Sequence, residues 1–159
     1  MLSNPSLILG SRTVPFTIVI ADDEMDYRLI VRRLLLALSG TVTIVGEAAD
    51  GDMALALVRS QRPDILITDL VMPGLDGVQL TRRIREELPQ TKIILMSSYT
   101  EDAYRLSASD SGADAFINKL VLTSSFVPAV QDVIRRRLCG GSYPLPPGTG
   151  TSSASPTPA

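Results

Sequence analysis

The stretch Ile65-Leu66-Ile67-Thr68-Asp69-Leu70-Val71-Met72-Pro73-Gly74-Leu75-Asp76-Gly77 decides the fold. It begins with an apolar run of strand length, which ends in the carboxylate of Asp69. Pro73-Gly74 and Asp76-Gly77 are turn-forming pairs that close the strand at once. The pattern predicts a buried strand with an acidic side chain at its carboxyl end. Open α/β sheets bind their ligands at that edge.

A second strand of the same kind occurs earlier in the chain. The apolar run from Thr17 to Ile20 is followed by Asp22-Asp23-Glu24. Carboxylate oxygens at two strand ends are the ligands that hard divalent cations prefer. The two ends together therefore favour a cation site and phosphoryl chemistry.

Strand-like and helix-like segments alternate from Phe16 onward. The predicted strands are 16–21, 41–47, 64–69, 92–97 and 115–117. The predicted helices are 26–38, 52–60, 78–88, 101–109 and 125–138, with Gly40 ending the first and Pro128 in the first turn of the last. Five such units predict an α/β fold: a doubly wound parallel sheet with helices on both faces and right-handed crossovers.

Composition excludes several classes of function. The 159 residues are 45% hydrophobic, which suits one domain with a packed core. The net charge of -2 argues against nucleic-acid binding by bulk charge. The single cysteine, Cys139, permits no internal disulfide and fits a reducing cytoplasm. The absence of histidine excludes Ser-His-Asp and Cys-His catalysis and any histidine-ligated metal.

The two ends of the chain differ from its centre. Residues 1–15 are expected to form a flexible leader without the basic start of a signal peptide. Residues 140–159 are rich in Gly, Pro, Ser and Thr and are expected to be disordered. The folded domain is therefore expected at 16–139, and no apolar run approaches the length of a membrane span.

Four features follow strand ends: Asp22 with Asp23, then Asp69, Ser97 and Lys119. Because parallel strands end at the same edge, these side chains are expected to converge there. Taken singly, each has an ordinary structural explanation. The acids could be solvated or cap helices, the serine could be a plain strand-end hydroxyl, and the lysine could lie on the surface. The ordered set favours a phosphoryl-transfer site.

At these residues the chain resembles the response-regulator receiver domains of two-component signalling, in the manner of the chemotaxis receivers. The matching stretches are Ile20 to Glu24, Asp64 to Gly77, Ile94 to Ser98 and Gly112 to Lys119. The resemblance covers roughly 16–138. It implies a flavodoxin-like (βα)5 fold with five parallel strands in the order 2-1-3-4-5.

The resemblance also implies a site chemistry. Asp69 would accept a phosphoryl group from a phosphohistidine of a sensor kinase or phosphotransfer protein. Asp23 and Asp69 would bind Mg²⁺ directly, together with the backbone carbonyl of Val71, while Asp22 would act through water. Lys119 would pair with Asp69 and then with the phosphoryl oxygens. Such a domain catalyses only its own phosphorylation and dephosphorylation.

A switch is implied as well. Ser97 would move toward the phosphoryl group, and Phe116 would follow by changing rotamer. The output would be docking to a downstream protein, or phosphorylation-dependent homodimer formation, through the side that carries Tyr104 and Phe116.

Two departures from the family pattern bear on this mechanism. Leu120 stands where the family commonly has a proline that is often cis, so we expect a trans peptide after Lys119 and a differently shaped loop. Val71 and Tyr99 offer no carboxylate or amide to orient an attacking water. We therefore expect slow loss of the phosphoryl group.

Four other functions compete with this interpretation. The chain could be the receiver part of a longer DNA-binding transcriptional regulator, with its tail as a linker. An aspartyl phosphatase or phosphomutase would need an acid where Val71 stands. A dinucleotide-binding enzyme would need Gly-x-Gly-x-x-Gly after the first strand. A degenerate receiver would lack some of the site residues that are present here.

Overall fold

The fold is that of a computed structural model, which describes residues 14–99, 106 and 109–139. Its elements are β1 (Phe16–Ala21), α1 (Met25–Leu35), η2 (Leu36–Leu38), β2 (Val42–Ala48), α2 (Gly51–Gln61), β3 (Ile65–Asp69), α3 (Gly77–Glu87), β4 (Lys92–Ser97), β5 (Ala115–Asn118), η3 (Lys119–Val121) and α5 (Leu122–Cys139). Each predicted strand is present, with ends within about one residue of the prediction.

The five strands form one parallel sheet in the order β2-β1-β3-β4-β5. The predicted order is therefore confirmed. β1, β3 and β4 occupy the centre and are buried almost throughout, as apolar runs with helices on both faces should be. β2 and β5 form the edges and are only partly buried.

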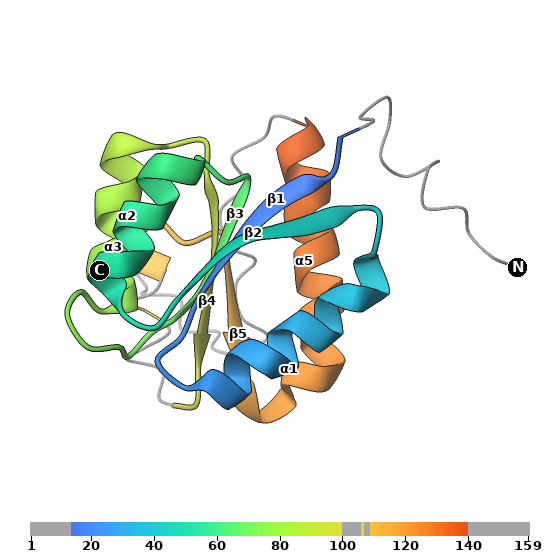
Figure 1. The fold of residues 1–159 in the computed structure, drawn as a ribbon, viewed down its shortest axis with the longest axis horizontal. Helices are drawn as coiled ribbons and strands as arrows, with labels where there is room; N and C mark the ends of the chain where they lie inside the picture. Colours follow the sequence, from blue (N-terminus) through green and yellow to red (C-terminus); the bar gives the residue numbers. More distant parts are fainter. Residues whose placement is uncertain (1–13, 100–105, 107–108, 140–159) are drawn as a thin grey trace, which may run out of the picture.

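Helices cover both faces of the sheet. α1 and α5 lie on one face, and α2 and α3 lie on the other (Figure 1). Alternate residues of the central strands enter two separate cores: Ile18 and Ile67 pack with Phe126 of α5, while Val19 and Leu66 pack with Leu80 of α3. This two-sided packing fixes the strand ends, and with them the side chains that follow each strand.

Local sequence signals set the ends of α1 and α3. The first helix continues into the 3-10 turn η2, which ends at Leu38. Gly40, the predicted helix terminator, lies in the turn that follows, with a φ of 85° that suits glycine. α3 begins with a reciprocal capping box, in which Asp76 accepts from the backbone N–H of Gln79 at 2.8 Å and donates its own N–H to the Gln79 side chain at 3.1 Å. The loop between Asp69 and α3 therefore has a defined end.

The prediction for the start of the last helix was wrong. α5 begins at Leu122, directly after η3, so Pro128 lies in the helix interior and not in its first turn. Helical geometry starts early because the Asn118 side chain caps the N–H of Leu120 at 2.8 Å. Pro128 and Ser124 are both exposed, so water can hydrogen-bond the Ser124 carbonyl that the proline leaves without a helical donor.

Several predictions fall outside the described residues. These are most of the helix at 101–109, the side chain of Tyr104, most of the leader at 1–15 and the tail at 140–159. Within the described part of the chain, no helix is long and apolar enough to cross a membrane.

Candidate functional site: an acidic cluster at the carboxyl edge of the sheet

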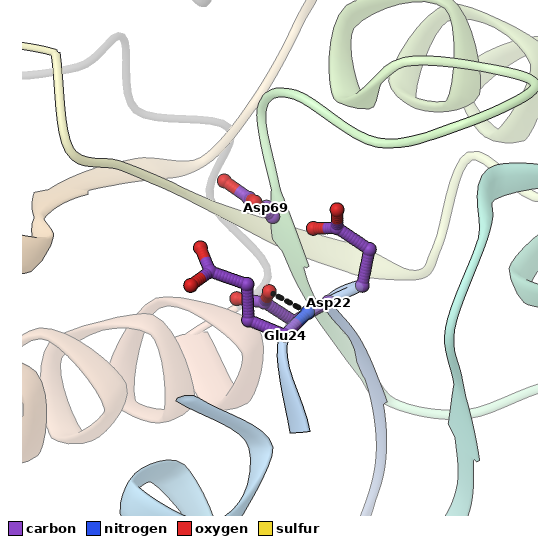
Figure 2. Close-up of side chains that lie close together, drawn as sticks. Asp22, Glu24 and Asp69 are labelled. Carbon is purple, nitrogen blue, oxygen red and sulfur yellow. Dashed lines mark hydrogen bonds between the residues drawn. The ribbon is translucent and has the colours of Figure 1, made fainter. Parts of the chain in front are cut away.

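Four carboxylates gather at the carboxyl edge of the sheet. Asp22, Asp23 and Glu24 follow β1, and Asp69 ends β3. One oxygen from each of them lies within 4.8 Å of the others. Figure 2 shows the side chains of Asp22, Glu24 and Asp69 directed toward one another. The acidic triplet is visible in the sequence, but only Asp22 and Asp23 were predicted to be site residues. The structure adds Glu24 to the cluster.

Asp22 is the fully buried member of the cluster. Its Oδ1 accepts the backbone N–H of Glu24 at 2.9 Å (Figure 2), and Arg28 Nη1 donates to its carbonyl at 2.6 Å. Its Oδ2 forms an ion pair with Lys119 Nζ at 2.7 Å. No other hydrogen-bond donor reaches that oxygen among the described residues. Asp22 is thus a fixed structural acid that keeps unused capacity to accept a hydrogen bond.

Asp69 is buried at the end of β3, with 6% of its surface exposed. Burial raises the pKa of its carboxyl to about 6; the Lys119 charge opposes this, the Asp22 charge adds to it, and the Val71 backbone N–H lowers it. Its Oδ2 lies 3.2 Å from Lys119 Nζ. Asp69 is therefore a carboxylate whose charge is costly, and it would gain from a bound cation.

Lys119 follows β5 and faces both buried acids. Its side chain is 1% exposed, and its ammonium lies between Asp22 Oδ2 and Asp69 Oδ2. Burial alone would lower the pKa of Lys119, but the hydrogen bond to Asp22 and the charges of Asp69 and Asp22 raise it above its usual value. The lysine is thus held charged, and the predicted pairing with Asp69 is present.

The Lys119 ammonium has one further neighbour that sequence reasoning missed. The ring of Tyr27 in α1 lies 3.9 Å from Nζ, measured to the ring centroid. Tyr27 has no role in the site that the sequence predicts. The contact of Tyr27 with Lys119 depends on how α1 packs against α5 and β1, and no local pattern contains that packing.

Ser97 lies on β4, which is next to β3, and Phe116 lies on the edge strand β5, on the other side of β4. Ser97 follows Met96, which pairs with Asp69 across β3 and β4, and it pairs with Asn118 of β5. It is 1% exposed, and its Oγ accepts the N–H of Tyr99 at 3.0 Å. Phe116 is half-buried and packs against Leu70, Leu95 and Ala113. The structure thus brings Ser97 to the site edge and places Phe116 in a small apolar cluster behind it.

The two positions predicted to tune the lifetime of a phosphorylated state lie at the surface. Val71 is 48% exposed and Tyr99 is 49% exposed. The described residues contain no cis peptide, so the trans bond expected after Lys119 is confirmed. Leu120 keeps the N–H that a proline would lack, and this N–H is the one that Asn118 caps. The loop shape therefore follows from the substitution.

The fold and the acidic edge define a class of protein. The family model for the response regulator receiver domain matches residues 18–131. The chain belongs to this family, and its sheet order is that of the flavodoxin-like receiver fold.

Relatives with known names agree with this assignment. The chain is 39% identical over 131 residues to "Probable transcriptional regulatory protein NarL" of Mycobacterium tuberculosis, covering 78% of this chain and 60% of that protein. It is 32% identical over 118 residues to "Response regulator protein VraR" of Staphylococcus aureus, covering 74% and 56%. The chain thus spans about 60% of the length of these curated relatives.

Solved structures show the same fold. The signal receiver domain of the response regulator NarL from Mycobacterium tuberculosis superposes with a TM-score of 0.71 at 36% identity, covering 76% of this chain and 97% of that one. The receiver domain of AraT from Geobacillus stearothermophilus gives a TM-score of 0.70 at 30% identity, covering 80% and 98%.

Proposed function

We propose that Asp69 accepts a phosphoryl group from a phosphohistidine on a sensor kinase or phosphotransfer protein. The observation that carries this proposal is the Asp69–Lys119 pair, 3.2 Å apart inside the acidic cluster. Lys119 occupies Asp69 Oδ2, which leaves the other carboxylate oxygen to act as the nucleophile. The buried ammonium is then in position to meet the charge that the phosphoryl oxygens bring.

The transfer step exchanges one bond for another. The Asp69 oxygen forms a bond to phosphorus while the phosphorus–nitrogen bond of the donor breaks, and the imidazole leaves with the bonding electron pair. With acetyl phosphate as donor, a phosphorus–oxygen bond breaks and acetate leaves. The product is an acyl phosphate on Asp69. The domain would catalyse only this reaction on itself and the slow hydrolysis of the acyl phosphate, in which water takes up the phosphoryl group as inorganic phosphate and the Asp69 carboxylate is restored.

The acidic cluster fits a Mg²⁺ ion. Its donors are carboxylate oxygens, which this cation prefers, and they carry more negative charge than Lys119 balances. Asp23, Asp69 and the backbone carbonyl of Val71 would hold the ion, and Asp22 Oδ2 would accept a hydrogen bond from one of its waters. When bound, Mg²⁺ would neutralise charge between the carboxylates and the incoming phosphoryl group.

The switch would run from Ser97 to Phe116. Ser97 is buried and directly follows Met96, the residue that pairs with Asp69 between β3 and β4. A small movement would therefore bring its hydroxyl to a phosphoryl oxygen on Asp69. Phe116 is only half-buried, so the space on its exposed side leaves room for a second rotamer. The result would be an altered surface for a downstream protein or for a second copy of the chain.

A second candidate concerns the whole protein. The NarL relative is named as a transcriptional regulatory protein, and this chain spans 60% of its length. On this reading the receiver would be one part of a DNA-binding regulator, working in the cytoplasm. The complete open reading frame would decide it: a DNA-binding domain after 159 would support it, and a stop codon there would exclude it.

Phosphorylation can be tested without the cognate kinase. The protein would be incubated with acetyl phosphate and Mg²⁺, and its intact mass compared with that of the Asp69→Asn variant. We expect one added phosphoryl group on the parent and none on the variant. An unmodified parent would contradict the proposed function.

A further inference from the structure

The Lys119 ammonium has a partner that the proposed phosphoryl chemistry does not use. Two of its sides face Asp22 Oδ2 at 2.7 Å and Asp69 Oδ2 at 3.2 Å. A third faces the Tyr27 ring, whose centroid lies 3.9 Å from Nζ. With a side chain only 1% exposed, the ammonium depends on these three groups in place of water.

The contact is favourable on electrostatic grounds. The face of an aromatic ring carries negative charge density and attracts a cation within about 6 Å of its centroid, more strongly where water is excluded. An ammonium has three N–H donors and no acceptor. The two carboxylates can accept hydrogen bonds from two of these N–H groups, and the third N–H group can interact with the face of the Tyr27 ring.

Tyr27 is itself held in place. It is partly buried and packs against the core formed by α1, α5 and the sheet, which includes Val31 of its own helix and Leu122 of α5. The packed ring therefore borders Lys119 on the side of α1. A lysine side chain has several rotatable bonds, and the ring restricts the positions that its ammonium can reach.

We propose that Tyr27 is a positioning residue that holds Lys119 Nζ against Asp69 for phosphoryl transfer, which rests on the function proposed above. In this role Tyr27 acts through the lysine, and not directly on the carboxylates or the phosphoryl donor. Its removal should slow phosphorylation while leaving Mg²⁺ binding by the carboxylates unchanged. A leucine would fill much of the same volume but would present hydrocarbon to the ammonium.

The test compares two substitutions in the complete chain. The rate of phosphorylation by acetyl phosphate at saturating Mg²⁺ would be measured for the parent, Tyr27→Phe and Tyr27→Leu, and Mg²⁺ affinity would be measured separately. We expect Tyr27→Leu to lose about 3- to 30-fold in rate, the range that a desolvated cation–π contact supports. Tyr27→Phe keeps the ring face and should retain most of the rate. Both variants should bind Mg²⁺ like the parent.

A double-variant cycle separates positioning from general packing. Tyr27→Leu would be combined with Lys119→Gln, which removes the cation. If the ring acts through the ammonium, Tyr27→Leu has no further effect on the rate in the Lys119→Gln background. An equal loss in both backgrounds would overturn the proposal, as would a Tyr27→Leu rate equal to or above that of the parent. A parent that takes no phosphoryl group would instead refute the proposed function.

Discussion

Lys119 lies closer to Asp22 than to Asp69: its Nζ is 2.7 Å from Asp22 Oδ2 and 3.2 Å from Asp69 Oδ2. Asp22, which is not the proposed nucleophile, thus holds Lys119 more closely than Asp69 does. Neutralising it should release Lys119 toward Asp69. We expect Asp22→Asn to lower the pKa of Asp69, because a like charge is removed and the lysine is freed. Titration of the Asp69 carboxyl by NMR in metal-free buffer checks this, and an unchanged or higher pKa would contradict it.

The raised pKa of Asp69 predicts that this carboxyl increasingly destabilises the metal-free protein as pH rises through the range between its unfolded and folded pKa values. Its folded pKa, about 6, exceeds the ordinary value of 3.8, so the folded state binds more protons between those values. The contribution of Asp69 to the free energy of unfolding therefore falls as pH rises from 3.8 to about 6, and above pH 6 the whole cost of burying the ionised Asp69 carboxylate is present. At pH 7.5 in EDTA, Asp69→Asn should therefore raise the free energy of unfolding by roughly 1–3 kcal/mol.

The comparison needs a second pH and a control. At pH 4 the gain from Asp69→Asn should shrink, because the parent carboxyl is then largely protonated. Asp110→Asn, at an exposed site, should change little at either pH. Urea unfolding gives the free energy of unfolding of the parent and of both variants at each pH. A variant less stable than the parent at pH 7.5 would show that the Lys119 pair outweighs the burial cost.

Mg²⁺ binding should compete with the proton on Asp69. Since the cation needs the ionised carboxylate, its apparent affinity should weaken by about tenfold per pH unit below pH 6. Asp23→Asn should weaken binding at every pH, because it removes a proposed ligand. Thermal melting with and without Mg²⁺ gives the shift at each pH. A shift that is the same at pH 5 and pH 7.5 would argue against Asp69 as a ligand.

Gly77 lets α3 start against the backbone of Asp69. A Cβ at this position would clash with the Asp69 carbonyl oxygen and crowd Leu70, and both are backbone contacts that cannot swing away. Gly77→Ala should thus destabilise the protein by roughly 1–3 kcal/mol and displace the acidic site. Gly46→Ala is the matched control, because its Cβ would meet only the flexible Leu57 side chain at 3.2 Å. Equal melting temperatures for the two variants would contradict the prediction.

The lifetime of the phosphorylated state is expected to be long. Val71 and Tyr99 are exposed beside the site, and neither has a carboxylate or amide to orient a water. Val71→Asn should speed dephosphorylation several-fold. Loss of the phosphoryl group from the parent within seconds, in Mg²⁺ without a phosphatase, would refute slow decay.

Much of the fold was predictable because its signals are local. The apolar runs ending at Ala21, Asp69 and Ser97 define central strands, and burial on both faces leaves few other arrangements. The start of α5 was not predictable in this way. Proline at 128 pointed to a first turn, whereas the cap from Asn118 to Leu120 begins the helical geometry earlier. The interior position of Pro128 is tolerated because it faces solvent.

The candidate site shows the same division. Asp22, Asp69 and Lys119 could be predicted as neighbours because parallel strands end at one edge. The contact of Tyr27 with Lys119 could not, because it depends on how α1 packs against α5 and β1. Nor could the sequence show that Asp22 holds Lys119 more closely than Asp69 does.

The most direct test of the central claim is the position of the phosphoryl group. Borohydride reduces an aspartyl phosphate to homoserine, which peptide sequencing by mass spectrometry locates. After treatment with acetyl phosphate and Mg²⁺, the account predicts homoserine at position 69 and aspartate at 22 and 23. Homoserine at another acid of the cluster, or none at all, would contradict it.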